Sequence, residues 1–323
     1  MAGYQPDSDS TRMATQLNST ARYIMSQAFA PSTTVTYRRA ANLYQIFCTK
    51  TGKSFPFYPL NFQDAIQFIA FLFQCKLSAN SISTYLAAIA TINKLHRGVD
   101  IFGSFVIKKL LAGVHRIRGS IDMRLPIQID LLHALVDSTT HVVATLYMQL
   151  LLKAIYLLAF HAFLRIGEIT AKNESDATRP LQWKDVAFQP ASNPSSCVIT
   201  LRETKNSVSS QAIHLRAAAV SQPNRCPVAA MNHFQRMRGP QAGMFFILPD
   251  KRAFTKHAFN AMLARSIAWV GLDASRYKAH SFRIGAATTA ALQGIGDDKI
   301  QLLGRWRSSA FRKYIRISQL KAN

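Results

Sequence analysis

Apolar residues recur every three or four positions through most of residues 17–118, which is the spacing of one face of an α-helix. The pattern predicts helices over about 33–51, 59–77, 79–96 and 103–118, and Ser78 suits the N-cap of the third. Residues 1–16 are small and polar without such a period, so we expect a disordered tail there. Residues 17–118 are therefore expected to form one compact helical domain.

Residues 119–126 (GSIDMRLP) lose the helical period and end in a proline, which predicts a linker. A short helix is expected over about 128–138, followed by an apolar run over 142–164. That run is long enough to cross a bilayer, but Lys153 stands at its centre and Arg165 follows its end. Because a charge at the centre of a membrane span is costly, the pattern favours a helix buried in a protein core.

The pattern changes over residues 181–215. Three runs rich in strand-forming residues, QWKDVAF, CVITLRE and SQAIHLR, are separated by turn-forming segments and predict a small antiparallel sheet. Helical spacing then returns over about 227–238, 256–271, 279–293, 297–303 and 308–318. The expected fold is mainly α with a small antiparallel β-sheet, and its second domain covers residues 127–323.

The chain carries 39 Lys and Arg against 16 Asp and Glu, a formal net charge of +23. The excess is spread along it, with 13 basic against 4 acidic residues in 1–120 and 26 against 12 in 121–323. This charge favours a polyanionic partner, most simply nucleic acid, although a generally basic protein would show it too. We expect both domains to contact the polyanion, as the two jaws of a clamp.

Several kinds of site are missing from the sequence. The four cysteines are scattered without a C-x-x-C pair, which predicts buried thiols in a reducing compartment rather than disulfides or a zinc site. The segment Gly52-Lys53-Ser54 resembles the end of a P-loop, but Phe47 stands where its first glycine is needed. We therefore expect no cofactor, no metal and no nucleotide. If the protein is an enzyme that acts on a nucleic acid, it must neutralise the phosphate charge with its own Lys and Arg side chains.

Residues that can carry chemistry gather in 278–316, where His280 and Arg283 form an H-x-x-R pair. Tyr314 follows in a strongly basic segment, with the neighbours Arg312, Lys313 and Arg316. Cations around a tyrosine hydroxyl draw an anionic substrate towards it, which suits attack on a phosphodiester. An amphipathic helix with a solvated basic face would show the same pattern.

Attack on a phosphodiester builds charge on the non-bridging oxygens, and a planar guanidinium binds two of them at once. Besides Arg283, Arg165 is a candidate, although it also stands three residues before Glu168 and can form a structural salt bridge with it. Lys205, in the turn of the predicted hairpin, can protonate a leaving oxygen, but most hairpin lysines are simply solvated. His280 can exchange a proton with the tyrosine or be a helix-start histidine bonded to backbone groups.

Arg165 within L-R-x-x-E, Lys205 on a hairpin, the His280/Arg283 pair and Tyr314 follow one another in an order that resembles the tyrosine recombinase (phage integrase) family. The ending LLGRWRSSAFRKYIR looks most like the recombinases of eukaryotic DIRS- and Crypton-type mobile elements. The likeness implies a helical core-binding domain over 17–118 and an integrase-like catalytic domain over 127–323.

The resemblance also implies roles. Tyr314 would attack the scissile phosphate and form a 3′-phosphotyrosyl link, which keeps the bond energy, so strand exchange would need neither ATP nor metal. Arg165 and Arg283 would hold the phosphate. Lys205 would protonate the leaving 5′-oxygen, and His280 would assist.

Relatives carry a His or Trp shortly before the nucleophile, usually nine positions ahead. Counting nine back from Tyr314 gives Arg305, whereas Trp306, a residue of the expected type, stands eight back. We favour Trp306 for this role and expect Arg305 and Glu168 to support the site. Further DNA contacts are expected from basic residues in both domains: Arg38, Arg39, Lys108, Lys109, Arg116, Arg118, Arg307, Arg312, Lys313 and Arg316.

The expected function is site-specific DNA recombination and integration by a homo-oligomer on double-stranded DNA, with a dimer on one site and a tetramer in synapsis. The alternatives are a catalytically inactive, domesticated DNA-binding protein of the same fold and a type IB topoisomerase-like enzyme. We expect no membrane partner. The resemblance to mobile-element recombinases implies a nuclear location in a eukaryote and a cytoplasmic one otherwise. The polar N-terminus shows no secretory signal, so secretion is not expected.

Overall fold

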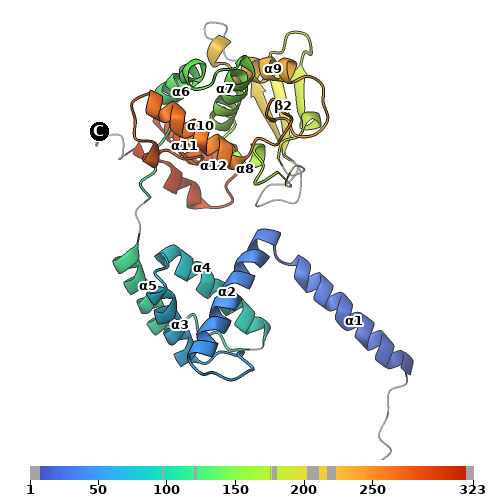
Figure 1. Ribbon diagram of the computed structural model, residues 1–323, viewed down its shortest axis with the longest axis vertical. Coiled ribbons are helices and arrows are strands. Elements are labelled where there is room, and N and C mark those ends of the chain that lie inside the picture. Colours follow the sequence, from blue (N-terminus) through green and yellow to red (C-terminus); the bar gives the residue numbers. More distant parts are fainter. Residues whose placement is uncertain are drawn as a thin grey trace, which may run out of the picture. The chain divides into compact units, whose positions relative to one another are not determined.

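The computed structural model describes residues 8–96, 98–119, 122–174, 176, 180–201, 211–216 and 223–317 (Figure 1). The chain divides into two compact units, Met1–Asp122 and Met123–Asn323, and the division falls inside the predicted 119–126 linker. The described part is mostly helical with one three-stranded antiparallel sheet. The predicted fold class is therefore confirmed.

The first unit is built from helices, with the bounds α1 Ser8–Gln27, α2 Pro31–Lys50, α3 Phe62–Gln74, α4 Ala79–Leu95 and α5 Phe105–Arg118. The side chains of Asn61, Ser78 and Ser104 each accept a backbone N–H three residues ahead and cap α3, α4 and α5. Because such a cap replaces a missing helical hydrogen bond, α3 begins after Asn61 and not at residue 59. Buried aromatic rings, among them Phe47 and Phe68, fill the core.

Helix α1 corrects one prediction. It begins at Ser8, so the expectation of a disordered tail over residues 1–16 is wrong for residues 8–16, while residues 1–7 lie outside the described part. All described side chains from Thr11 to Gln27 are exposed. The segment contains Met, Ala, Leu and Gln, which favour a helix by intrinsic propensity without any buried face, and this signal was hidden by the polar residues between them.

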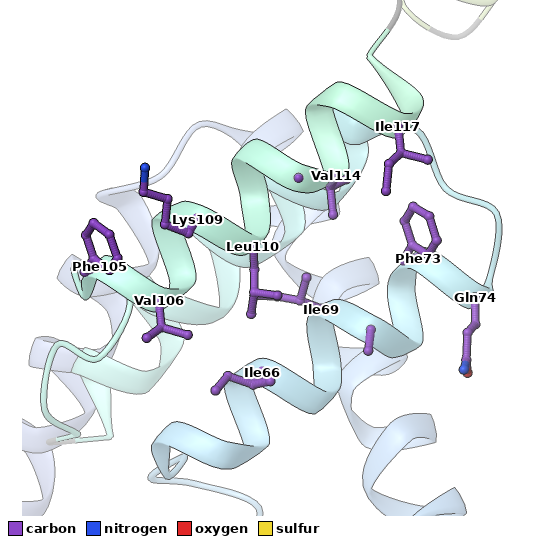
Figure 2. Close-up of a pocket in the computed structure, with 12 residues that line it drawn as sticks. Ile66, Ile69, Phe73, Gln74, Phe105, Val106, Lys109, Leu110, Val114 and Ile117 are labelled. Atoms are coloured by element: carbon purple, nitrogen blue, oxygen red, sulfur yellow. The ribbon is translucent and has the colours of Figure 1, made fainter.

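Helices α3 and α5 leave an apolar groove of about 600 Å³ on the surface of the first unit (Figure 2). Ile69 and Phe73 line it from α3, and Leu110 and Ile117 line it from α5. Lys109, one of the predicted DNA contacts, also borders the groove, and its ammonium nitrogen lies 5.2 Å from the ring centre of Phe105.

The second unit holds α6 Ile129–Val142, α7 Leu146–His161, α8 Ile166–Ile169, α9 Pro227–Arg238, α10 Lys256–Trp269, α11 Ser281–Leu292 and α12 Asp297–Leu303. Short 3-10 helices lie between them: η1 Trp183–Asp185, η2 Pro223–Arg225, η3 Ala274–Arg276 and η4 Ser309–Tyr314. Helix α7 packs against α6, α9 and α11, so it forms the centre of this unit (Figure 1).

The apolar run over 142–164 is not one helix. Helix α6 ends at Val142, and the Thr145 side chain accepts the Met148 N–H to start α7. Nearly every α7 side chain from Leu151 onwards is buried, so the predicted core position is confirmed. Across the described ranges, no helix is long and apolar enough to cross a membrane.

The sheet has the order β1-β2-β3 with antiparallel neighbours, and the strand bounds are β1 Val186–Gln189, β2 Ser196–Leu201 and β3 Gln211–Arg216. Val186 pairs with Ile199, and Leu201 pairs with Gln211. The segment 202–210 between β2 and β3, with the predicted Lys205, lies outside the described residues.

The C-terminal segment differs from its prediction. The sequence predicts an α-helix over about 308–318, but the structure has the 3-10 helix η4, which ends at Tyr314. The carbonyl oxygen of Tyr314 and the N–H of Arg316 are hydrogen-bonded to the Thr288 hydroxyl on α11. These bonds to a neighbouring helix take the place of the bonds that would continue a helix past Tyr314.

Candidate active site

Helix α11 packs closely against the segment around Ile127, near the start of the second unit. The N–H of Ile127 donates to the carbonyl oxygen of Ser281 at 3.0 Å. A Cβ atom added to Gly285 would lie 1.7 Å from the carbonyl oxygen of Ile127, so only glycine allows this approach. The close packing places Arg283 in the interior of the unit and leaves His280, just before it at the start of α11, half-buried.

Arg283 has no exposed surface. Its Nη1 donates to the carbonyl oxygen of Phe163 at 2.7 Å and its Nη2 to that of Gly304. The guanidinium carbon lies 4.1 Å from the ring centre of Trp306 and 5.8 Å from that of Tyr314. Burial, with help from the nearby Arg165 charge, lowers the pKa of Arg283 to about 9, so the group is still charged at neutral pH.

Glu168 lies between two arginines. Its Oε1 accepts from Arg165 Nη1 at 2.9 Å and its Oε2 from Arg305 Nη2 at 2.9 Å. Oε2 also accepts the Arg165 backbone N–H at 2.8 Å, a bond that caps the N-terminus of the short helix α8. The salt bridge that the sequence left open is therefore present. With Arg283 nearby, the cluster holds three guanidinium groups and one carboxylate, and this excess of positive charge favours an anionic ligand.

Two residues of this cluster have left-handed backbone conformations, Phe163 with φ of 50° and Arg305 with φ of 53°. Arg305 Nη1 donates to the carbonyl oxygen of Ala162 at 3.1 Å, and its Nη2 lies 3.5 Å from that of Phe163. Non-glycine residues adopt this conformation at some energetic cost. At Arg305, the bonds to Glu168 and to the carbonyl oxygens of Ala162 and Phe163 offset that cost.

The hydroxyl of Tyr314 lies 3.2 Å from Nε2 of His280. Burial first, and then the positive charges of Arg124 and Arg283, lower the pKa of His280 to about 4. The imidazole is therefore neutral at neutral pH and can accept a proton from the tyrosine hydroxyl.

Trp306 provides the second ring beside the tyrosine. Its ring centre lies 5.1 Å from that of Tyr314. A Cβ atom on Gly304 would lie 1.5 Å from the indole ring, so the ring can occupy this place only next to glycine. Of the two residues that the sequence left open, Trp306 lies beside Tyr314, and Arg305 points to Glu168.

The structure thus brings together Arg165, Glu168, His280, Arg283, Arg305, Trp306 and Tyr314, with Lys205 outside the described residues. Sequence reasoning missed the carbonyl oxygen of Phe163 and the hydroxyl of Thr288. A backbone carbonyl leaves no signal in a sequence. Thr288 lies in the same predicted helix as Arg283, five residues later, which is a weak signal. The sequence could not distinguish it from the adjacent Thr289.

Three of the ten predicted DNA contacts form a hydrogen bond, an ion pair or a close stacking contact inside the chain. Arg118 lies with its guanidinium carbon 3.7 Å from the ring centre of Phe73, Arg312 pairs with Asp297 at 3.0 Å, and Arg316 donates to the Arg124 carbonyl oxygen. The remaining seven side chains are exposed: Arg38, Arg39, Lys108, Lys109, Arg116, Arg307 and Lys313. The three with internal partners are therefore weaker candidates for phosphate contacts than the sequence indicated.

Within the ranges that the structure describes, no group of three or more His, Cys, Asp or Glu side chains is placed to hold a metal ion. Charged groups near the site include the three arginines and Glu168, with Arg124 and Lys256 close enough to act on His280.

No known family model and no curated protein matches this chain. Solved structures do match. The XerH site-specific recombinase on a palindromic difH substrate is 14% identical with a TM-score of 0.62, and the match covers 89% of this chain and 77% of that one. The Tn1549 transposon integrase with transposon right end DNA is also 14% identical with a TM-score of 0.62, covering 94% and 96%.

A lambda integrase dimer bound to a COC′ core site is 13% identical with a TM-score of 0.57, covering 97% of this chain and 81% of that one. These structural neighbours are tyrosine recombinases and integrases, and at such identities the match establishes the fold. The chain has the fold of that family.

Proposed function

We propose that this protein is a site-specific DNA recombinase that cuts and rejoins DNA strands through Tyr314. The observation that carries the proposal is the position of the Tyr314 hydroxyl, 3.2 Å from a neutral His280 and beside the buried guanidinium of Arg283. A nucleophile, a proton acceptor and a cation that can bind phosphate oxygens lie together in one unit, which is the arrangement that attack on a phosphodiester needs.

In the proposed step, Arg165 and Arg283 bind the non-bridging oxygens of the scissile phosphate. The Tyr314 oxygen attacks phosphorus while its proton passes to His280. The bond from phosphorus to the 5′-oxygen breaks, and that oxygen takes a proton, for which we propose Lys205 as the donor. A 3′-phosphotyrosyl link remains.

The phosphotyrosyl link is a diester like the one it replaced, so its formation conserves the energy of the bond. A 5′-hydroxyl from another strand can attack the link and release Tyr314 by the reverse of the same step. Rejoining therefore needs no separate source of energy, and DNA integration or strand exchange follows when the attacking strand comes from a second duplex.

We propose double-stranded DNA as the partner and a homo-oligomer as the working form, with a dimer on one site and a tetramer in synapsis. The net charge of +23 supports a polyanionic partner. The matched lambda integrase is a dimer on its core site, and exchange of strands between two duplexes requires more than one active site. The likeness of the C-terminal sequence to DIRS- and Crypton-type recombinases stays a prediction, and so does a role in a mobile element.

The test is a trapped adduct. The protein is incubated with DNA from the flanks of its own gene, nicked near candidate sites so that a cleaved strand cannot be rejoined. We expect a covalent protein–DNA adduct from the wild type and none from Tyr314→Phe with DNA binding intact. The control Tyr277→Phe should give an undiminished yield, because Tyr277 is a core tyrosine of the same unit that the proposed step does not use.

An adduct of full yield from Tyr314→Phe would remove that residue from its role. Binding without any adduct from the wild type would favour an inactive DNA-binding protein of this fold. Relaxation of supercoiled plasmid by the monomer at no preferred site would favour a topoisomerase.

A further inference from the structure

We infer that Thr288 is a positioning residue that sets the place of Tyr314 relative to the phosphate-binding groups, an inference that rests on the proposed function. Thr288 lies on α11, five residues after Arg283, and has no exposed surface. It touches neither of the reacting groups itself. It acts on the backbone of the segment that carries the nucleophile.

A single hydroxyl bridges the two sides of Ile315. The Thr288 Oγ1 donates to the carbonyl oxygen of Tyr314 at 3.1 Å and accepts from the N–H of Arg316 at 3.1 Å. A hydroxyl has one proton and two lone pairs, so it can make both bonds at once. The backbone directly after Tyr314 is therefore held against α11.

These two bonds matter because η4 is a short 3-10 helix, in which hydrogen-bond geometry is poorer than in an α-helix. Such a segment defines the position of its last residue weakly. Helix α11 carries His280 at its start, Arg283 in its first turn and Thr288 beyond it. One rigid element thus sets the proton acceptor, the phosphate-binding arginine and the backbone of the nucleophile together.

A second contact holds the same segment. The guanidinium of Arg316 donates to the carbonyl oxygen of Arg124. The chain around Arg124 is itself fixed, because the next residue, Leu125, donates its N–H to the carbonyl oxygen of Arg276 at 2.8 Å. The residues after Tyr314 are therefore held at Arg124 as well as at Thr288, and the bond from Thr288 reaches the Tyr314 carbonyl oxygen itself.

The chain offers a matched control in the next residue. Thr289 has a buried hydroxyl for which the described residues provide no hydrogen-bond partner. Thr288→Val and Thr289→Val make the same chemical change at adjacent positions of one helix. Only the first removes the bonds to the Tyr314 carbonyl and the Arg316 N–H.

The first measurement is amide hydrogen exchange of Arg316 in the protein without DNA. Loss of one hydrogen bond is expected to speed this exchange about 5- to 10-fold in Thr288→Val, while Thr288→Ser and Thr289→Val keep the wild-type rate. An unchanged rate in Thr288→Val would overturn the inference, whatever the outcome for DNA cleavage.

The second measurement is the single-turnover rate of adduct formation on nicked DNA. A misplaced nucleophile is expected to slow cleavage by about 10- to 100-fold in Thr288→Val, with the DNA dissociation constant unchanged. Thr288→Ser, which keeps the hydroxyl, should restore most of the rate. A wild-type rate in Thr288→Val, with an active wild type beside it, would overturn the positioning role.

The two measurements separate the two claims. If the wild type forms no adduct, the proposed function fails, and the exchange experiment still tests the contact. If Thr288→Val does not fold, as judged by its thermal midpoint, Thr288→Ala against Thr288→Ser provides the same comparison, because that pair differs only in the hydroxyl oxygen. A slower cleavage shared equally by Ala and Ser would contradict the inference.

Discussion

The guanidinium carbon of Arg283 lies 4.1 Å from the ring centre of Trp306, and the arginine has no exposed surface. A buried cation needs compensation for its lost hydration. The face of an aromatic ring provides part of it, and the carbonyl oxygens of Phe163 and Gly304 provide more. The protein itself thus compensates for much of the hydration that the buried guanidinium has lost.

Trp306→Ala removes this ring and leaves a cavity, because only 9% of the residue is exposed. We expect a loss of about 3–5 kcal/mol in the free energy of unfolding and a slower adduct formation, with Trp306→Phe losing less of both. Urea unfolding and the trapped-adduct assay measure the two effects. The control is Trp269→Ala, since Trp269 is 50% exposed. Equal losses from both tryptophans would contradict the role of the Arg283 contact.

Glu168→Ala removes the carboxylate that pairs with Arg165 and Arg305. Breaking a buried pair leaves uncompensated charges, so we expect the free energy of unfolding to fall by about 3–5 kcal/mol. The matched change is Glu174→Ala, which removes an exposed carboxylate 3.7 Å from Arg252 and is expected to cost less than about 1 kcal/mol. Urea unfolding of both variants measures the two losses in the free energy of unfolding. A small loss from Glu168→Ala would mean that the three arginines do not depend on it.

The free protein should become more stable as the pH rises from about 4 to 6.5. The pKa of His280 is lowered from 6.5 to about 4 by burial and neighbouring cations, so in this window the unfolded chain binds more protons than the folded one. The contribution is complete above pH 6.5 and is lost as the pH falls towards 4. His280→Gln removes it, so its urea midpoint should depend less steeply on pH. If the urea midpoints of the variant and the wild type changed equally with pH, His280 would not be the source of this pH dependence.

Arg116 and Arg118 lie near each other on α5 and are expected to act differently. Arg116 is exposed, so Arg116→Ala should weaken DNA binding, lower the salt dependence by about one unit of slope and leave stability unchanged. Arg118 packs on Phe73 and donates to its carbonyl oxygen, so Arg118→Ala should lower the unfolding midpoint. DNA titrations at several salt concentrations, with urea unfolding, test both. The reverse assignment of effects would show that Arg118 is the phosphate contact.

Local signals predicted much of this protein correctly. Periodicity predicted the helices around Phe47, Phe68 and Leu151, since burial of one face repeats with the turn of the helix. Spacing also predicted that His280 and Arg283 share one helix start, although His280 is the N-cap and the helix begins at Ser281. These features depend on residues a few positions apart, so they can be read from the chain alone.

Other features depend on contacts between distant segments. Counting positions before Tyr314 could not choose between Arg305 and Trp306. The left-handed backbone at Arg305 turns its side chain towards Ala162 and Glu168, 143 and 137 positions earlier. The end of η4 at Tyr314 likewise involves a distant contact, the hydrogen bond from the Thr288 hydroxyl on α11 to the Tyr314 carbonyl oxygen. Amino-acid order indicated which groups can do the chemistry, and long-range packing decided which of them meet, because a few distant hydrogen bonds outweigh weak local preferences.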